Sequence, residues 1–218
     1  MNTIIPTILT DNFTEFKNKL DNLIASEIIF PFIQIDVMDG KFVNNISFKE
    51  REEINQISQK FDFELHLMVE HPITEIETWK NVSAIKKVLI PIESKDDITE
   101  TIKLTRDLDW SVGLSVNPET PLEKIDPYID HIDSVLFLTV NPGAQGNPLI
   151  PEVGEKVKKF KETYVHMTCS VDGGINTENI ALVSNWGADY FCIGSALIGQ
   201  PDIKTAYNNL INSLENLE

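Results

Sequence analysis

Eight short apolar segments alternate along the sequence with segments whose apolar residues recur every three or four positions. The apolar segments cover residues 3–9, 28–37, 63–68, 87–92, 110–116, 134–140, 169–172 and 190–193. The first intervening segment shows the helical spacing clearly, with Phe13, Phe16 and Leu20 on one face. Eight consecutive strand–helix units predict a single (β/α)8 TIM barrel. A doubly wound open sheet is the alternative, but no strand-to-helix turn has the Gly-x-Gly-x-x-Gly spacing that would favour it.

Length and composition indicate the domain organisation. The chain has 218 residues and is 42% hydrophobic, so it can bury one large core, and we expect residues 1–218 to form one domain. We expect a short helix over residues 122–129. Another expected helix begins at a Thr177 cap and ends before Gly187.

Three polar residues occupy matching positions at the ends of apolar segments. Side chains alternate between the two faces of a strand, so Asp36 and Gln34 point inward while Ile35 points outward. His66 and Asp172 have comparable positions in their own segments. The functional side of such a barrel lies at the carboxyl ends of its strands, so we expect Asp36, His66 and Asp172 to converge. This group can bind a divalent metal, act as general acid and base, or form a buried polar network without chemistry.

Glycine-containing loops follow the last three apolar segments. They include Gly143, Gly146, Gly173, Gly174, and Gly194 with Ser195. Each loop alone is compatible with an ordinary strand-to-helix turn. Together they predict a phosphate site, because glycine lets backbone N–H groups approach an anion and barrel enzymes often bind phosphate after strands seven and eight. Met38 and Met68 share the inward face and either belong to the core or wall a pocket against water.

The charge of the chain limits its partners. It has 18 basic and 34 acidic residues and a net charge of −16, which opposes binding to nucleic acid or anionic membranes. No uninterrupted apolar run reaches the roughly 20 residues of a membrane span. Cys169 and Cys192 lie inside apolar segments, and the N-terminus has no basic region followed by an apolar one. We therefore expect a cytoplasmic protein with free thiols.

Six stretches between Pro6 and Ser195 resemble the ribulose-phosphate 3-epimerase family in order and spacing. They are Pro6-Thr7-Ile8-Leu9, Asp36-Val37-Met38-Asp39-Gly40 with Phe42-Val43, His66-Leu67-Met68-Val69, Thr139-Val140-Asn141-Pro142-Gly143, Val171-Asp172-Gly173-Gly174 and Gly194-Ser195. The resemblance implies a (β/α)8 barrel that interconverts ribulose 5-phosphate and xylulose 5-phosphate. One aspartate would remove the C3 proton, another would return a proton on the opposite face, and a divalent metal would stabilise the enediolate.

The resemblance also implies roles for individual residues. Asp36 and Asp172 would be the acid/base pair and metal ligands, and His66 would be a third ligand and contact the substrate. The metal would be Zn²⁺, Mn²⁺, Fe²⁺ or Co²⁺. The remaining substrate contacts would come from Thr7, Met38, Met68, Gly143, Gly146, Gly173, Gly174, Gly194 and Ser195. We also expect a homo-oligomer.

Nearly all departures from the family pattern fall in the site, and the residue that departs most is Gln34. Gln34 stands where the family has a histidine ligand, and a side-chain amide binds late divalent ions more weakly than imidazole does. We therefore expect the metal to be weakly bound or absent. The alternatives are an epimerase for another ketose phosphate, such as allulose 6-phosphate, and a non-catalytic phosphosugar-binding relative. Retention of Asp36, His66 and Asp172 favours an enzyme, because a chain without catalysis has no need to hold two carboxylates close together.

Overall fold

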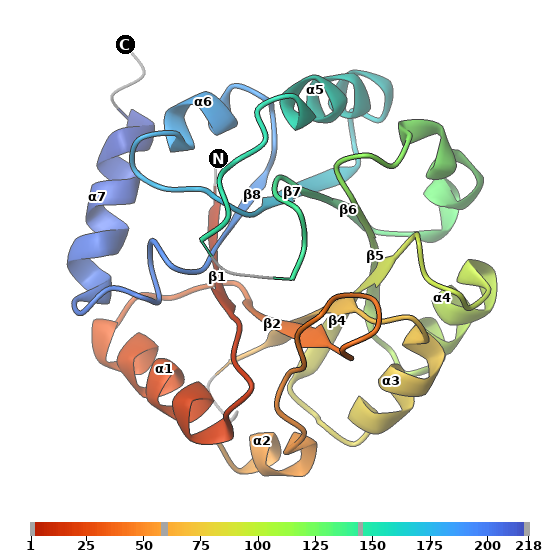
Figure 1. Cartoon of the computed structure of the whole chain (residues 1–218), viewed down its shortest axis with the longest axis horizontal. Helices are drawn as coiled ribbons and strands as arrows, with labels where there is room; N and C mark the ends of the chain where they lie inside the picture. Colours follow the sequence, from red (N-terminus) through yellow and green to blue (C-terminus); the bar gives the residue numbers. More distant parts are fainter. Residues whose placement is uncertain (1–2, 58–60, 144–145, 216–218) are drawn as a thin grey trace.

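Eight parallel strands close into a barrel at the centre of the molecule (Figure 1). The computed structural model describes residues 3–57, 61–143 and 146–215. The strands are β1 (Thr3–Ile8), β2 (Ile33–Met38), β3 (Phe63–Met68), β4 (Ile85–Pro91), β5 (Ser111–Val116), β6 (Ser134–Leu138), β7 (Thr168–Asp172) and β8 (Tyr190–Ile193). Each strand pairs with its sequence neighbour, and β1 pairs with β8, which closes the sheet. The predicted (β/α)8 barrel is confirmed.

Helices surround the barrel and cover its outer face (Figure 1). They are α1 (Phe13–Ser26), α2 (Arg51–Ile57), α3 (Pro72–Trp79), α4 (Ile98–Asp107), the 3-10 helices η1 (Leu122–Lys124) and η2 (Asp126–His131), α5 (Val153–Thr163), α6 (Ile180–Ser184) and α7 (Ile203–Glu215). Their apolar faces supply large side chains to the core, and Phe16, Trp79 and Phe160 are fully buried. Burial of such side chains is the main favourable contribution to folding.

Two expected helices differ in the structure. The expected helix over residues 122–129 is instead η1 followed by η2. An α-helix starting at Leu122 would need an N–H group at Pro127 to bond with the carbonyl of Glu123, and proline has none. The expected Thr177 cap is also wrong, because Asn176 accepts the N–H of Glu178 with its side chain and the N–H of Ile180 with its carbonyl.

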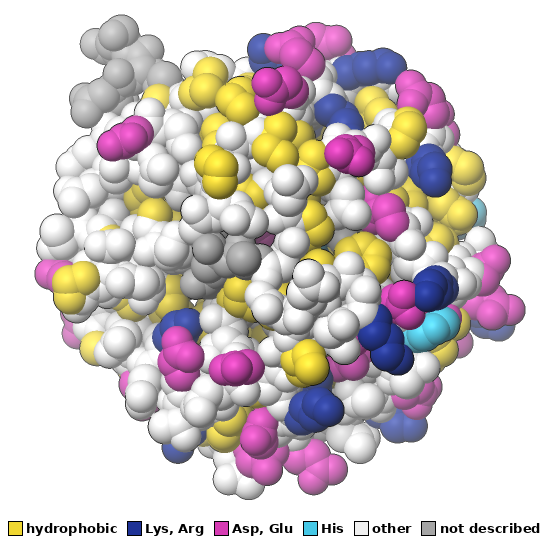
Figure 2. Space-filling model, in the orientation of Figure 1, with side chains coloured by type: hydrophobic (Ala, Val, Ile, Leu, Met, Phe, Trp, Pro, Cys, Tyr) yellow, Lys and Arg dark blue, Asp and Glu magenta, His cyan; other side chains and the backbone are white. Residues whose placement is uncertain are grey.

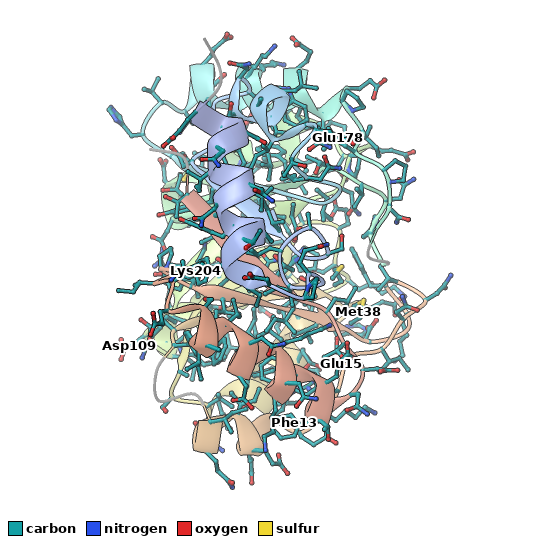
Figure 3. All side chains as sticks on the ribbon, turned by 90° about the vertical axis from the view of Figure 1, so that its left-hand side faces the viewer. Phe13, Glu15, Met38, Asp109, Glu178 and Lys204 are labelled. Atoms are coloured by element: carbon teal, nitrogen blue, oxygen red, sulfur yellow. The ribbon has the colours of Figure 1, made fainter. Side chains whose placement is uncertain are left out.

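The two ends of the barrel lie on opposite sides of the molecule. Met38, at the carboxyl end of β2, and Asp109, just before β5, lie toward opposite ends in the side view (Figure 3). Figure 2 shows the face with the carboxyl ends, where most charged side chains lie toward the edge. Within the described residues, none of the helices has the length and apolar character needed to cross a membrane.

Candidate active site

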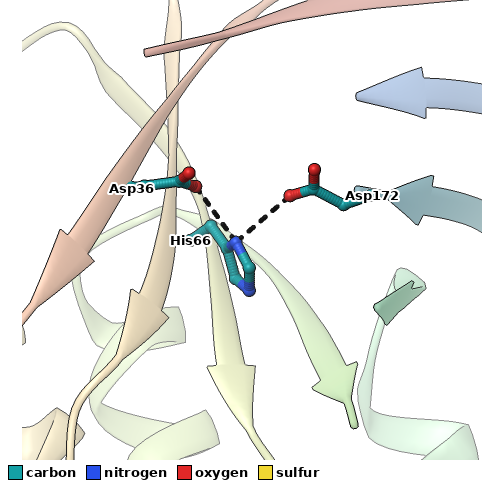
Figure 4. A group of neighbouring side chains, drawn as sticks. All are labelled: Asp36, His66 and Asp172. Carbon is teal, nitrogen blue, oxygen red and sulfur yellow. Dashed lines mark hydrogen bonds and ion pairs between the residues drawn. The ribbon is translucent and has the colours of Figure 1, made fainter. Parts of the chain in front are cut away.

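Three adjacent or facing strands bring Asp36, His66 and Asp172 together. Asp36 on β2 and His66 on β3 are register neighbours, and Asp172 is the last residue of β7. His66 Nδ1 lies 3.1 Å from Asp36 Oδ1 and 3.4 Å from Asp172 Oδ2, so the imidazole stands between the two carboxylates (Figure 4). All three residues are buried, with at most 8% of their surface exposed. The convergence expected from the sequence is therefore present.

Gln34 lies beneath the same group and contacts both carboxylates. Its Nε2 donates to Asp36 Oδ1 at 3.0 Å and to Asp172 Oδ2 at 2.7 Å. The side chain is completely buried, and its Oε1 has no hydrogen-bond partner among the described residues. Gln34 thus does face the position between Asp36 and Asp172, as the strand alternation predicts.

Burial and close charges shift the ionisation of this group. Burial raises the pKa of Asp36; the His66 hydrogen bond lowers this pKa, and the nearby charge of Asp172 raises it again. Burial alone would lower the pKa of His66, but hydrogen bonds to Asp172 and Asp36 together with their negative charges outweigh burial and raise it to about 10. Two buried carboxylates thus favour a positive charge between them, whether an imidazolium or another cation.

The donor set fits a divalent metal ion. One ligand atom from each of Asp36, His66 and Asp172 can be chosen so that all lie within 4.8 Å of one another. Two carboxylates and an imidazole are suitable ligands for Zn²⁺, Mn²⁺, Fe²⁺ or Co²⁺, whereas Mg²⁺ prefers oxygen ligands only. Rotation of the Gln34 amide group by a half-turn would interchange its NH2 group and its unpartnered Oε1. The oxygen, a hydrogen-bond acceptor, would then face the position between Asp36 and Asp172.

A pocket opens above this group at the carboxyl ends of the strands. Its lining includes the predicted residues Thr7, Asp36, His66, Met68, Gly143, Gly146, Asp172, Gly173, Gly174, Gly194 and Ser195. The Thr7 hydroxyl is buried and has no partner among the described residues. No lysine or arginine lines this pocket within the described part of the chain. An anion here would therefore depend on backbone N–H groups and hydroxyls.

Met38 does not line this pocket but packs behind it. Met38, Val43 and Met68 form a small buried cluster, and Leu9 and Phe42 pack against it. Met38 and Met68 stand two residues beyond Asp36 and His66 on β2 and β3, so the cluster is an apolar neighbour of the polar group. Leu9, Val140 and Ile175 also line the pocket, although the sequence pattern does not distinguish them from ordinary core residues.

Gly174 shows why glycine is required beside the pocket. Its φ of +68° is in the left-handed region, and a Cβ built there would lie 2.6 Å from the backbone nitrogen of Leu149. The loop after β7 therefore packs against the loop after β6 by backbone contact. A larger residue at position 174 would push these two loops apart.

Comparison with known proteins identifies the family. The chain matches the model of the Ribulose-phosphate 3 epimerase family over residues 3–198. It belongs to the ribulose-phosphate 3-epimerase family. It is 31% identical to ribulose-phosphate 3-epimerase of Bacillus subtilis (strain 168), over 96% of this chain and 98% of the relative. It is 27% identical to the Escherichia coli (strain K12) protein of the same name, over 97% and 95%. The predicted class, an isomerase acting on carbohydrate phosphates, is confirmed by this membership.

Solved structures with the same fold are more distant in sequence. KGPDC from Streptococcus mutans has a TM-score of 0.71 at 11% identity and covers 100% of this chain and 99% of its own. The 3-hexulose-6-phosphate synthase from Salmonella typhimurium has a TM-score of 0.72 at 13% identity and covers 99% and 100%. At these identities, the similarity shows only that both proteins share the barrel fold with this chain.

Proposed function

We propose that the protein interconverts ribulose 5-phosphate and xylulose 5-phosphate by proton transfer at C3. The observation that carries the proposal is the pair of buried carboxylates, Asp36 and Asp172, which reach one pocket from β2 and β7. Inversion at a carbon next to a carbonyl requires a base on one face and an acid on the other. The family of the chain supports this reaction over other proton transfers.

In this mechanism the carboxylate of one aspartate takes the C3 proton, and the substrate becomes an enediolate. The carboxyl group of the other aspartate then gives a proton to the opposite face of C3, so the configuration is inverted. One carboxyl group starts protonated and the other ends protonated, so the number of protons is conserved. Proton exchange with water restores the starting state.

The contacts of Gln34 and His66 would orient the two acids. Both side chains contact Oδ1 of Asp36 and Oδ2 of Asp172, which leaves the second oxygen of each carboxyl group for proton transfer. Asp36, His66 and Asp172 would hold a divalent metal, for which we propose Zn²⁺, Mn²⁺, Fe²⁺ or Co²⁺. When bound, the metal would stabilise negative charge on the enediolate oxygens.

The glycine loops would hold the phosphate of the substrate. Gly146, Gly174, Gly194 and Ser195 are among the residues that line the pocket. Backbone N–H groups without a shielding side chain, together with the Ser195 hydroxyl, can surround phosphate oxygens. A ketose without phosphate should therefore be a poor substrate.

Substitution of the two aspartates tests the proposal. Asp36→Asn and Asp172→Asn are isosteric substitutions. Each should lower kcat for ribulose 5-phosphate by ~10²–10⁴-fold, the usual contribution of a general acid or base. Circular dichroism should show an intact fold in both variants. Asp109→Asn, at the opposite end of the barrel (Figure 3), is the matched control and should retain the rate of the parent.

Three results would overturn parts of the proposal. A near-parental rate in either variant at position 36 or 172 would remove that residue from the mechanism. Faster turnover of allulose 6-phosphate than of ribulose 5-phosphate would change the substrate. If the protein binds both phosphosugars in deuterated water but the hydrogen at C3 is not replaced by deuterium, the protein is a non-catalytic phosphosugar-binding relative.

A further inference from the structure

Asn179 fixes one peptide group of the loop after β7. Its Nδ2 donates to the carbonyl of Gly174 at 2.8 Å, and its Oδ1 accepts the N–H of Asn176 at 2.9 Å. Both ends of the amide are therefore engaged, so the side chain has a defined orientation. The carbonyl of Gly174 is held toward Asn179, which is not among the residues that line the main pocket.

Gln200 fixes a peptide group in the loop after β8 in the same way. Its Nε2 donates to the carbonyl of Ser195 at 3.1 Å. Gly199 packs closely against the same carbonyl, since a Cβ at position 199 would lie 2.7 Å from the Ser195 oxygen. The Ser195 carbonyl is thus surrounded by the segment that carries Gln200.

The two amides lie in a separate hollow outside the main pocket. Asn176, Asn179 and Gln200 line this outer hollow, and Gly174, Ile175 and Ser195 line both the hollow and the pocket. Gly146 and Asn147 of the loop after β6 also line both, so the loops after β6, β7 and β8 together separate the two spaces. Figure 1 shows the last two of these loops leading from β7 and β8 to α6 and α7.

Holding a carbonyl also fixes the N–H of the same peptide. In a trans peptide the C=O and N–H bonds point in opposite directions. With the carbonyls of Gly174 and Ser195 held by amides of the outer hollow, the N–H groups of Ile175 and Ala196 must point away from Asn179 and Gln200. Ile175 lines the main pocket as well as the hollow, and Ala196 lines the hollow and directly follows Ser195, which lines both. Among the described residues, neither N–H has a hydrogen-bond partner. In the adjacent peptide, Thr139 Oγ1 donates to the carbonyl of Gly173 at 2.5 Å, and Thr139 does not line the main pocket.

We propose that Asn179 and Gln200 are positioning residues for phosphate recognition. They hold carbonyls away from the pocket, so that the loops after β7 and β8 present N–H groups rather than carbonyl oxygens to the phosphate of the substrate. This inference rests on the phosphate site of the proposed function. Since no lysine or arginine among the described residues lines the pocket, the direction of these N–H groups decides whether the pocket attracts or repels a phosphate.

Neutral substitutions separate this role from charge effects. Asn179→Leu removes the donor to Gly174 at similar side-chain volume, and Gln200→Met removes the donor to Ser195 without shortening the side chain. Asn185→Leu is the matched control, because Asn185 Nδ2 also donates to a backbone carbonyl, that of Ala181, at an exposed site outside both cavities. The measurements are the Kd of inorganic phosphate by titration calorimetry, and KM and kcat for ribulose 5-phosphate.

The expected result is a change in phosphate affinity with retained turnover. Asn179→Leu should raise the phosphate Kd and the KM for ribulose 5-phosphate by roughly three- to tenfold, the effect of one hydrogen bond, with kcat within about twofold of the parent. Gln200→Met should raise both constants by about twofold to threefold, because its hydrogen bond is exposed. Asn185→Leu should change neither constant.

Contrary outcomes are distinguishable. If the parent binds phosphate and both Asn179→Leu and Gln200→Met bind it equally well, the positioning role is wrong while the phosphate site remains. If the parent binds phosphosugar but no inorganic phosphate at millimolar concentration, phosphate recognition by backbone N–H groups is wrong. The positioning role of Asn179 and Gln200 is then wrong as well. If Asn185→Leu weakens binding as much as Asn179→Leu does, the effect is general and the role is also overturned. Turnover of the parent tests the proposed function separately from these binding results.

Discussion

The amide of Gln34 bridges the two carboxylates of the site. Its NH2 group donates to both Asp36 and Asp172, and hydrogen bonds to charged groups are about twice as strong as neutral ones. For Gln34 to become a metal ligand, the amide must turn and give up both hydrogen bonds. Ligation of a metal by Gln34 therefore competes with an interaction that already stabilises the aspartates.

Replacement of Gln34 by histidine should tighten metal binding. Imidazole is a stronger ligand than an amide for late divalent ions, and even the loss of an outer partner of a ligand typically costs ~10–100-fold in affinity. We expect substoichiometric metal in the purified parent, activity that rises with added Mn²⁺ or Zn²⁺, and a Kd for these ions that is lower in Gln34→His by about the same factor. Elemental analysis and calorimetric titration measure this directly.

A matched control and a chelator decide between two roles of Gln34. Gln56→His on the exposed surface of α2 adds a histidine away from the site and should not change metal affinity there. Full activity of the parent in EDTA, with no metal detected in the protein, would contradict weak metal binding. Gln34 would then belong to a metal-free site in which the aspartate pair works alone.

At the residue scale, the sequence predicts which residues form the site but not which hydrogen bonds they make. Alternation along a strand places Asp36 and Gln34 on the inner face, and the position of Asp172 at a strand end brings it near them. The double hydrogen bond of Gln34 depends on side-chain torsions that no pattern encodes. Asn179 and Gln200 follow their strands by several residues, and turn-rich sequence gives no indication of which carbonyl each amide contacts.

At the scale of elements, the sequence predicts that each strand exists better than it predicts the residues at which the strand begins and ends. The apolar run that begins at Ile28 suggests a long second strand, but β2 begins at Ile33. Pro31 has no N–H to donate to the ladder, and Ile29 is 95% exposed. The apolar run is therefore divided between the connection from α1 and the strand itself. Hydrophobicity alone does not reveal this division.

A buried ion pair between neighbouring strands is a second feature that periodicity does not predict. Glu64 on β3 and Lys87 on β4 are register neighbours, 2% and 7% exposed, and Lys87 Nζ lies 2.9 Å from Glu64 Oε2. Removal of one member of such a pair leaves a buried charge without a partner. Lys87→Met should lower the free energy of unfolding by ~3–5 kcal/mol, measured by urea denaturation.

Two further variants separate the ion pair from general packing. Lys86→Met, at the exposed neighbouring position of β4, should change stability little. The double variant Glu64→Leu/Lys87→Met should be more stable than Lys87→Met, because both charges are removed together. Equal stability of Lys87→Met and Lys86→Met would mean that the pair contributes nothing. We propose that residues 1–218 form one domain, so tryptophan fluorescence and circular dichroism should report the same transition in the parent.

At the scale of the whole molecule, the charge of the chain opposes the charge of its proposed substrate. The net charge is −16, and a phosphate monoester carries about −1.5 to −2 at pH 7. On the face that contains the barrel mouth, most charged side chains lie toward the edge (Figure 2). Attraction of the phosphate must therefore come from groups inside the pocket, while the rest of the molecule repels it over longer distances.

This arrangement predicts an unusual dependence on salt. Increasing the ionic strength from ~0.01 M to ~0.15 M shortens the screening length from about 30 Å to about 8 Å. Long-range repulsion should weaken, while short hydrogen bonds inside the pocket should change little, so kcat/KM for ribulose 5-phosphate should rise by on the order of twofold. Unphosphorylated ribulose, which is uncharged, is the matched control and should show no such rise. A several-fold fall in kcat/KM with salt would instead indicate that a lysine or arginine attracts the phosphate, and would contradict recognition by backbone N–H groups.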